Sequence, residues 1–222
     1  MVKGEYKIFY RRKLPHLQPL EGTFFITYRL HNSLPKSLLK QLKIEFEYDK
    51  MKAQGQRGRL AAEHKQEALN HIYQEYFKKL DAILDKIVDG VSYLKNEKVA
   101  KIVADSLHYW DNKKLDLICY CIMPNHVHAV FTLYREDTNG KIISLDDMMK
   151  SIKGVSARYC NQVLGLKGQF WHHESYDRLV RDRDELDGII AYVLDNPVKA
   201  GLCENRKDWQ WSYTREEFNE YL

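Results

Sequence analysis

The stretch that decides the fold is MPNHVHAVF, residues 123–131. Its Pro-Asn pair is typical of a tight turn, and the residues that follow alternate in character as they would on a β-strand. His126 and His128 fall on one face of that strand. The other face is apolar and comprises Val127, Ala129, Phe131 and Leu133. The pattern predicts a strand with two adjacent imidazoles close to a turn.

Two histidines at this spacing on a strand can reach one metal ion. The same short pattern also describes two histidines on an exposed sheet face. The apolar opposite face and the preceding turn favour a functional role for His126 and His128. The residues alone leave both interpretations open.

The flanking sequence predicts a mixed fold. Strands are expected at 21–31, 115–122, 126–134 and around 176–180, and helices at 96–111, 144–165 and 183–195. Asn96 and Ser144 are N-cap candidates, Gly165 is a candidate helix end, and Pro197 should stop the last helix. This order predicts an α+β class, with an antiparallel sheet and helices packed on one face.

Residues 36–90 differ from the rest in being highly charged with helical spacing. A Gly-rich interruption at 54–58 predicts two helices joined by a loop. We interpret 36–90 as a helical insertion within a single domain that spans residues 1–222.

The last predicted helix carries Tyr192 and, four residues later, Asn196. Residues at this spacing lie about 40° apart around a helix, so the phenol and the amide are neighbours. If this face meets the histidine pair, Asn196 is a candidate third metal ligand and Tyr192 a candidate nucleophile. A core-edge tyrosine and a helix-ending asparagine are the alternative.

Composition bounds the class of protein. The formal net charge is only +4, but residues 150–183 hold seven Lys/Arg against three Asp/Glu, and residues 1–29 hold six against two. Such basic segments fit either a phosphate-binding surface or a solvated surface. The four scattered cysteines indicate reduced thiols, and we find neither a secretory signal nor a membrane span, so a cytoplasmic location is expected.

Together these motifs carry a family resemblance. MPNHVHAVF resembles the His-hydrophobic-His motif of the HUH superfamily of single-strand nucleases. GQFWHHESYDRLVRD and IIAYVLDNPVKAGL are similar to the C-terminal half of the REP-associated tyrosine transposases, which are of the IS200-like type. RRKLPHLQPLEGTFFITYRLHNSLP resembles their first strand and its approach. The resemblance covers roughly residues 11–213 and is weakest in the insertion.

The resemblance implies a ferredoxin-like or RRM-like fold whose sheet face holds a divalent metal, Mg²⁺ or Mn²⁺. By position, His126, His128 and Asn196 would be metal ligands and Tyr192 the nucleophile. Tyr176 is a rival nucleophile. Tyr192 is preferred, because Val180 occupies the place four residues after Tyr176.

The implied activity is cleavage and rejoining of structured single-stranded DNA through a 5′-phosphotyrosine intermediate. DNA hairpins are the implied partners of a nucleoid-associated monomer or homodimer. Lys150, Lys153, Arg158, Arg178, Arg181 and Arg183 are candidate phosphate contacts, and Phe170, Trp171 and Tyr176 could stack on bases.

Three other functions fit parts of this pattern. The chain could be a domesticated, non-catalytic binder of DNA hairpins, although the complete set of candidate site residues argues against it. It could be an HUH nickase of replication or conjugation, but 222 residues leave no room for the usual partner domain. An RNA-binding RRM-like module ranks last, because no RNP-type aromatic run is present.

Overall fold

The computed structural model describes residues 21–55, 62–86 and 90–222. Most of the basic N-terminal segment, the approach to the first strand and most of the loop expected at 54–58 lie outside these residues. The chain divides into two compact units, residues 32–91 and residues 1–31 with 92–222, which are described separately. The assignment of 1–222 to one domain with an insertion at 36–90 stays a prediction.

The unit of residues 32–91 is built from two helices, α1 (Lys36–Gly55) and α2 (Ala62–Lys86). They pack on each other through aromatic side chains, because the Phe46 ring lies 5.0 Å from the rings of both Tyr73 and Tyr76. An ion pair of 3.1 Å between Lys79 and Glu45 also joins the two helices. The sequence predicted two helices in this region.

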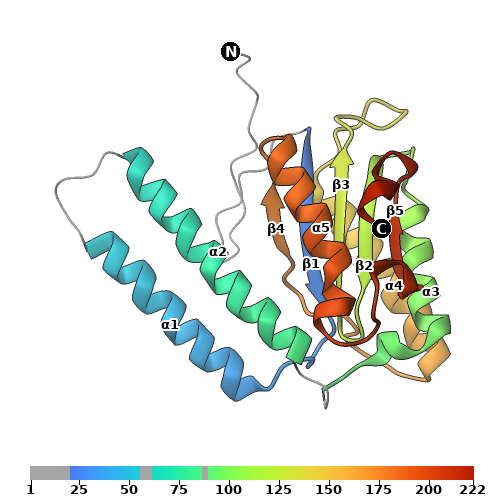
Figure 1. The fold of residues 1–222 in the computed structure, drawn as a ribbon, viewed down its shortest axis with the longest axis horizontal. Coiled ribbons are helices and arrows are strands. Elements are labelled where there is room, and N and C mark those ends of the chain that lie inside the picture. Colours follow the sequence, from blue (N-terminus) through green and yellow to red (C-terminus); the bar gives the residue numbers. More distant parts are fainter. Residues whose placement is uncertain (1–20, 56–61, 87–89) are drawn as a thin grey trace. The chain divides into compact units, whose positions relative to one another are not determined.

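The other unit contains a five-stranded antiparallel sheet in the order β4-β1-β3-β2-β5 (Figure 1). The strands are β1 (Gly22–Arg29), β2 (Leu115–Ile122), β3 (His126–Leu133), β4 (Tyr176–Leu179) and β5 (Ser212–Thr214). The first four strands were expected, whereas β5 and the short 3-10 helices at Tyr93–Lys95, Arg206–Asp208 and Glu216–Tyr221 were not.

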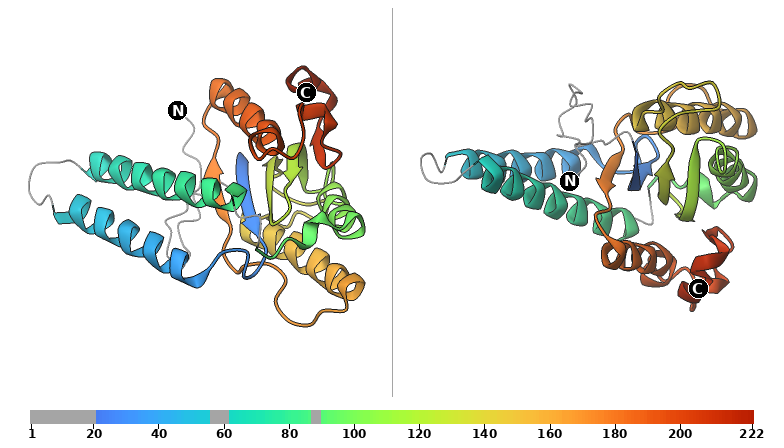
Figure 2. Two further views of the ribbon diagram at one scale, coloured as in Figure 1. Left: turned by 60° about the horizontal axis from the view of Figure 1, so that its bottom comes forward. Right: turned by 90° about the horizontal axis from the view of Figure 1, so that it is seen from above.

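Helices cover both faces of this sheet (Figure 2). They are α3 (Glu97–His108), α4 (Leu145–Leu164) and α5 (Arg183–Lys199). Tyr28, which pairs with Val127 in the sheet, contacts Trp171, and the indole of Trp171 donates to Ser156 on α4. The apolar face of β3 therefore meets α4, with α3 packed beside α4.

The α+β class with an antiparallel sheet is confirmed. The order β1-α3-β2-β3-α4-β4 is the βαββαβ arrangement of a ferredoxin-like fold, with α3 and α4 on one face. The expectation of helices on one face alone needs one correction, because α5 follows this arrangement and packs against the opposite face of β2 and β3.

The predicted helix signals act as expected. The Asn96 side chain accepts hydrogen bonds from the backbone N–H groups of Lys98 and Val99, and Ser144 accepts one from Asp147. These bonds satisfy backbone donors that have no partner inside the helix. Gly165 ends α4 with φ = 65°, a conformation that favours glycine.

The predicted stop at Pro197 is wrong, because α5 continues to Lys199. A proline removes one backbone N–H and crowds the carbonyl four residues before it, but it does not prevent the next residues from keeping helical dihedral angles. The side-chain amide of Asn196 also donates to the Tyr192 carbonyl at 3.2 Å, which supplies an additional hydrogen bond in the turn that precedes the proline. The extra half-turn places Lys199 on the same helix as Tyr192.

Among the helices of the described residues, none combines the length and the apolar character that a bilayer span requires.

Candidate active site

His126 and His128 lie side by side at the start of β3, and both side chains are fully buried. The rings cross at 81° and their two Nε2 atoms are 3.0 Å apart. The interpretation as two histidines on an exposed sheet face is therefore wrong. The two imidazoles converge on one point in the face of the sheet that α5 covers.

The other nitrogen of each ring is held by a neighbour. Nδ1 of His126 lies 2.6 Å from Oδ1 of Asn125, and Nδ1 of His128 lies 2.7 Å from the Thr27 hydroxyl. An amide oxygen can only accept, so His126 donates from Nδ1 and its Nε2 carries the lone pair of the neutral ring. The Thr27 hydroxyl can donate or accept, so it is compatible with either tautomer of His128.

Burial keeps both imidazoles neutral. Desolvation lowers the pKa of His126 to about 3. Desolvation, followed by the neighbouring His126, lowers the pKa of His128 well below its usual value. A histidine must be neutral to bind a metal ion, so this environment suits both residues to that role.

The two candidate nucleophiles flank a single phenylalanine. The Phe25 ring stacks on His128 at 5.6 Å and lies 6.3 Å from the Tyr176 ring and 6.0 Å from the Tyr192 ring. The Tyr192 ring also contacts the histidine pair, at 5.7 Å from the His128 ring. This placement favours Tyr192 over Tyr176, and the nucleophile itself stays a prediction.

Asn196 is buried on α5, one turn after Tyr192. The helix runs toward the end of the sheet at which β3 begins (Figure 1). Its Nδ2 donates to the Tyr192 carbonyl, whereas its Oδ1 is buried and has no hydrogen-bond partner among the described residues. A buried acceptor without a partner costs about 1–3 kcal/mol, which a bound ligand would offset.

These groups fit a divalent metal. Two nitrogen ligands about 2.1 Å from one ion and at right angles are about 3 Å apart, which agrees with the 3.0 Å between the two Nε2 atoms. Oδ1 of Asn196 is an oxygen donor of the kind that Mg²⁺ and Mn²⁺ accept. The role of Asn196 as a third ligand stays a prediction.

The six candidate DNA-binding residues fall into two groups. Lys153 and Arg178 are part-buried and make internal bonds: Lys153 donates to backbone carbonyls, and Arg178 pairs with Glu185. The residues of the second group are exposed, and Lys150 and Arg183 in this group also pair with a carboxylate on their own helix. The group consists of Lys150, Arg158, Arg181 and Arg183. The exposed residues are the better placed for phosphate.

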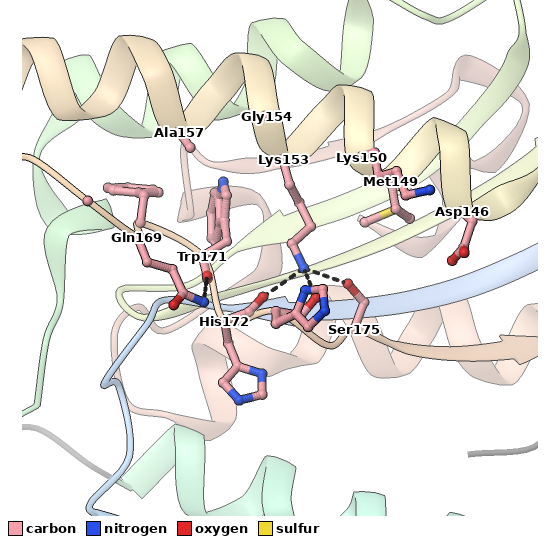
Figure 3. Close-up of a pocket in the computed structure, with 13 residues that line it drawn as sticks. Asp146, Met149, Lys150, Lys153, Gly154, Ala157, Gln169, Trp171, His172 and Ser175 are labelled. Atoms are coloured by element: carbon pink, nitrogen blue, oxygen red, sulfur yellow. Dashed lines mark hydrogen bonds between the residues drawn. The ribbon is translucent and has the colours of Figure 1, made fainter. Parts of the chain in front are cut away.

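Lys153 also forms part of a pocket of about 640 Å³ between α4 and residues 168–175 (Figure 3). Its Nζ bonds the carbonyls of His172 and His173 and the Ser175 hydroxyl. Phe170 and Trp171 are only 3% and 4% exposed. Their rings pack mainly against protein, which leaves little surface for stacking on a base.

Sequence reasoning missed the groups that orient the histidines. Thr27 and Phe25 are two positions apart on β1, so their side chains lie on the same face of the sheet. The pairing of Thr27 with His128 makes this the histidine face. The sequence predicted Asn125 as a turn residue, but not its hydrogen bond to His126. Arg29 pairs with His126 across the sheet and is also buried, so a positive charge lies beside the site.

Comparison with known proteins identifies the relatives of this region. Residues 91–196, which include the hairpin and the Tyr192–Asn196 pair, match the family model described as "Transposase IS200 like". The chain is similar to the IS200-like transposases. This finding confirms the resemblance seen in the sequence.

Two curated relatives bear the name REP-associated tyrosine transposase. The one from Haemophilus influenzae is 26% identical over 102 residues, which cover 44% of this chain and 57% of the relative. The one from Escherichia coli is 22% identical over 101 residues, which cover 46% of this chain and 55% of the relative. The matches thus span little more than half the length of either relative.

A solved structure of a REP-associated tyrosine transposase, bound to a REP hairpin, aligns with 92% of this chain and 82% of its own. The TM-score is 0.46 and the sequence identity 15%.

Proposed function

We propose that this protein is a metal-dependent tyrosine transposase that binds structured single-stranded DNA and cleaves and rejoins it. One observation carries the proposal: two buried, neutral imidazoles converge at 3.0 Å beside the Tyr192 ring, within a region that matches the IS200-like transposases. Repeat-type DNA hairpins are the substrate class expected from the family.

His126, His128 and Asn196 would hold the metal, for which the family resemblance favours Mg²⁺ or Mn²⁺. When bound, the metal would supply Lewis-acid stabilisation of the scissile phosphate. Asn125 and Thr27 fix the orientation of the two imidazoles, which keeps the ligand atoms directed at one point.

Tyr192 is the proposed nucleophile. Its phenolic oxygen loses a proton and attacks phosphorus, the P–O3′ bond breaks, and the 3′ oxygen leaves and takes up a proton. The product is a 5′-phosphotyrosine and a free 3′-OH. A second 3′-OH can reverse the reaction on the covalent intermediate and rejoin strands without an external energy source.

The exposed cations would hold the DNA. Lys150 and Arg158 lie on α4, whereas Arg181 lies just before α5. Arg183, which is also exposed, begins α5. Lys153 and Arg178 would have to exchange internal bonds for phosphate contacts, so we expect smaller contributions from them to the salt dependence of binding. The proposed place of action is the cytoplasm, on the chromosome, by a monomer or a homodimer.

The test is a denaturing gel of the full chain with labelled single-stranded hairpin DNA from beside its own gene, with and without Mn²⁺. The wild type should form a metal-dependent protein–DNA adduct, Tyr176→Phe should retain it, and Tyr192→Phe should lose it. Tyr176→Phe is the matched control, because both tyrosines contact Phe25.

Loss of the adduct only in Tyr176→Phe would keep the enzyme class and move the nucleophile. Hairpin binding without an adduct from any of the three proteins would overturn the catalytic proposal and favour a non-catalytic hairpin binder.

A further inference from the structure

Lys199, in the last turn of α5, has no part in the site as described so far. It follows Tyr192 by seven residues and Asn196 by three. Seven helical residues amount to about two turns, so Lys199 and Tyr192 lie within about 20° of the same line along the helix. Side chains on a helix lean toward its N-terminus, which directs the long lysine stem back toward Tyr192.

The structure shows this approach directly. The Lys199 Nζ lies 5.1 Å from the centroid of the Tyr192 ring, within the range of a cation–π contact. The Tyr192 ring in turn lies 5.7 Å from the His128 ring. A positive charge therefore lies next to the ring of the proposed nucleophile, and the same ring contacts the histidine pair.

The charge of Lys199 is only loosely engaged. Its Nζ is 3.7 Å from the nearer carboxylate oxygen of Asp195, too far for a hydrogen bond. Asp195 makes a much shorter contact of 2.5 Å with Arg206. Within the described part of the chain the Lys199 ammonium makes no hydrogen bond, and its side chain is 54% exposed.

We propose that Lys199 is a phosphate-binding residue of the active site, which contacts a non-bridging oxygen of the scissile phosphodiester as Tyr192 attacks it. This inference rests on the proposed strand-cleavage function. The phosphate gains negative charge in the transition state, and an ammonium group donates strong, charge-assisted hydrogen bonds to such oxygens. Lys199 would supply only hydrogen bonds and charge, so it adds no step to the exchange of the P–O3′ bond for a bond to Tyr192.

A purely structural role is the alternative. A lysine in the last turn also interacts favourably with the helix dipole, and one four residues after an aspartate can support the helix. Lys101 on α3 provides a matched control, because it forms an exposed i,i+4 pair with Asp105 on a helix that covers the other face of the sheet.

The experiment uses the full chain and a labelled hairpin DNA whose cleavage position has been mapped with the wild type. Single-turnover rates of adduct formation are measured at saturating DNA and Mn²⁺ for the wild type, Lys199→Gln, Lys199→Arg and Lys101→Gln. Each protein is tested on the normal DNA and on DNA with an uncharged methylphosphonate at the scissile position.

Loss of a charge-assisted hydrogen bond should slow Lys199→Gln about 10- to 100-fold on the normal DNA. On the methylphosphonate the two proteins should differ by no more than about 3-fold, because the charge that Lys199 recognises is absent. Lys199→Arg should recover much of the rate, and Lys101→Gln should match the wild type.

Equal rates for Lys199→Gln and the wild type on the normal DNA would overturn the inference. An equal loss on both DNAs, accompanied by a lower melting temperature, would assign Lys199 a structural role and also overturn it. If the wild type forms no adduct, the proposed strand cleavage itself has failed, which is a different outcome from either.

Discussion

The two faces of the sheet are both covered by helices, but they are built from different chemistry. The face under α3 and α4 is lined by apolar side chains such as Phe24 and Phe131, which are fully buried. The face under α5 contains His126 and His128, whose polar atoms are just as deeply buried. Burial of an apolar group stabilises a fold, whereas burial of a polar group costs free energy unless it is bonded.

The difference indicates a division of labour between the faces. The apolar face holds the fold together, and the histidine face maintains polar groups that stability alone does not require. Substitutions on the apolar face should therefore change folding, and substitutions on the histidine face should change ligand binding.

Truncation on the apolar face should have the largest effect. Phe131→Ala should lower the free energy of unfolding by about 3–5 kcal/mol, because it removes a buried ring and leaves a cavity. Urea denaturation followed by circular dichroism measures the change. A loss below about 1 kcal/mol would mean that this face does not form the main core.

Removal of one imidazole should abolish stabilisation by metal. At a Mn²⁺ concentration 100 times its dissociation constant, binding should raise the wild-type stability by about 2.7 kcal/mol. His128→Ala should show no such increase in thermal unfolding. An increase of the same size in His128→Ala, or none in the wild type, would contradict the assignment of the histidine pair as a metal site.

Acidification should destabilise the metal-free protein through the histidine face. The pKa of His126 is lowered from about 6.5 to about 3, so between these values the unfolded chain binds a proton that the folded chain does not. The free energy of unfolding should fall as the pH decreases from about 6.5 toward 3, by up to about 1.4 kcal/mol per pH unit for each such histidine.

The free energy of unfolding is measured between pH 6.5 and 5 in the presence of a chelator. Most carboxylates stay ionised in this range, so their titration contributes little to the change. His126→Gln should show a shallower dependence on pH than the wild type. If both proteins have the same slope, His126 is not buried in its neutral form.

The smallest expected effect concerns the exposed cations. Arg158→Gln should reduce the slope of log K against log salt for hairpin binding by about 0.7–0.9, the amount expected for one phosphate contact. Arg178→Gln should chiefly lower folding stability, because Arg178 pairs with Glu185. The reverse pattern would mean that the internal ion pair opens when DNA binds.

Much of the fold could be predicted from local sequence. The alternation of MPNHVHAVF placed β3 and separated its two faces, and the caps at Asn96, Ser144 and Gly165 located both ends of α4 and the start of α3. These signals depend on residues a few positions apart, so they are readable without the rest of the chain. The stop at Pro197 was mispredicted because a proline disfavours a helix locally without forbidding helical residues after it, and the structure continues α5 to Lys199.

What the sequence determined by itself was therefore the chemistry of each element: two imidazoles on one side of a strand, and a phenol and an amide on one side of a helix. Only the tertiary structure decided that α5 covers the histidine face, that Thr27 bonds His128 across 101 positions of chain, and that Lys199 reaches the Tyr192 ring. Periodicity specifies which side chains share a face. The face that two elements turn toward each other depends on how the whole unit buries its apolar surface, and no local pattern records it.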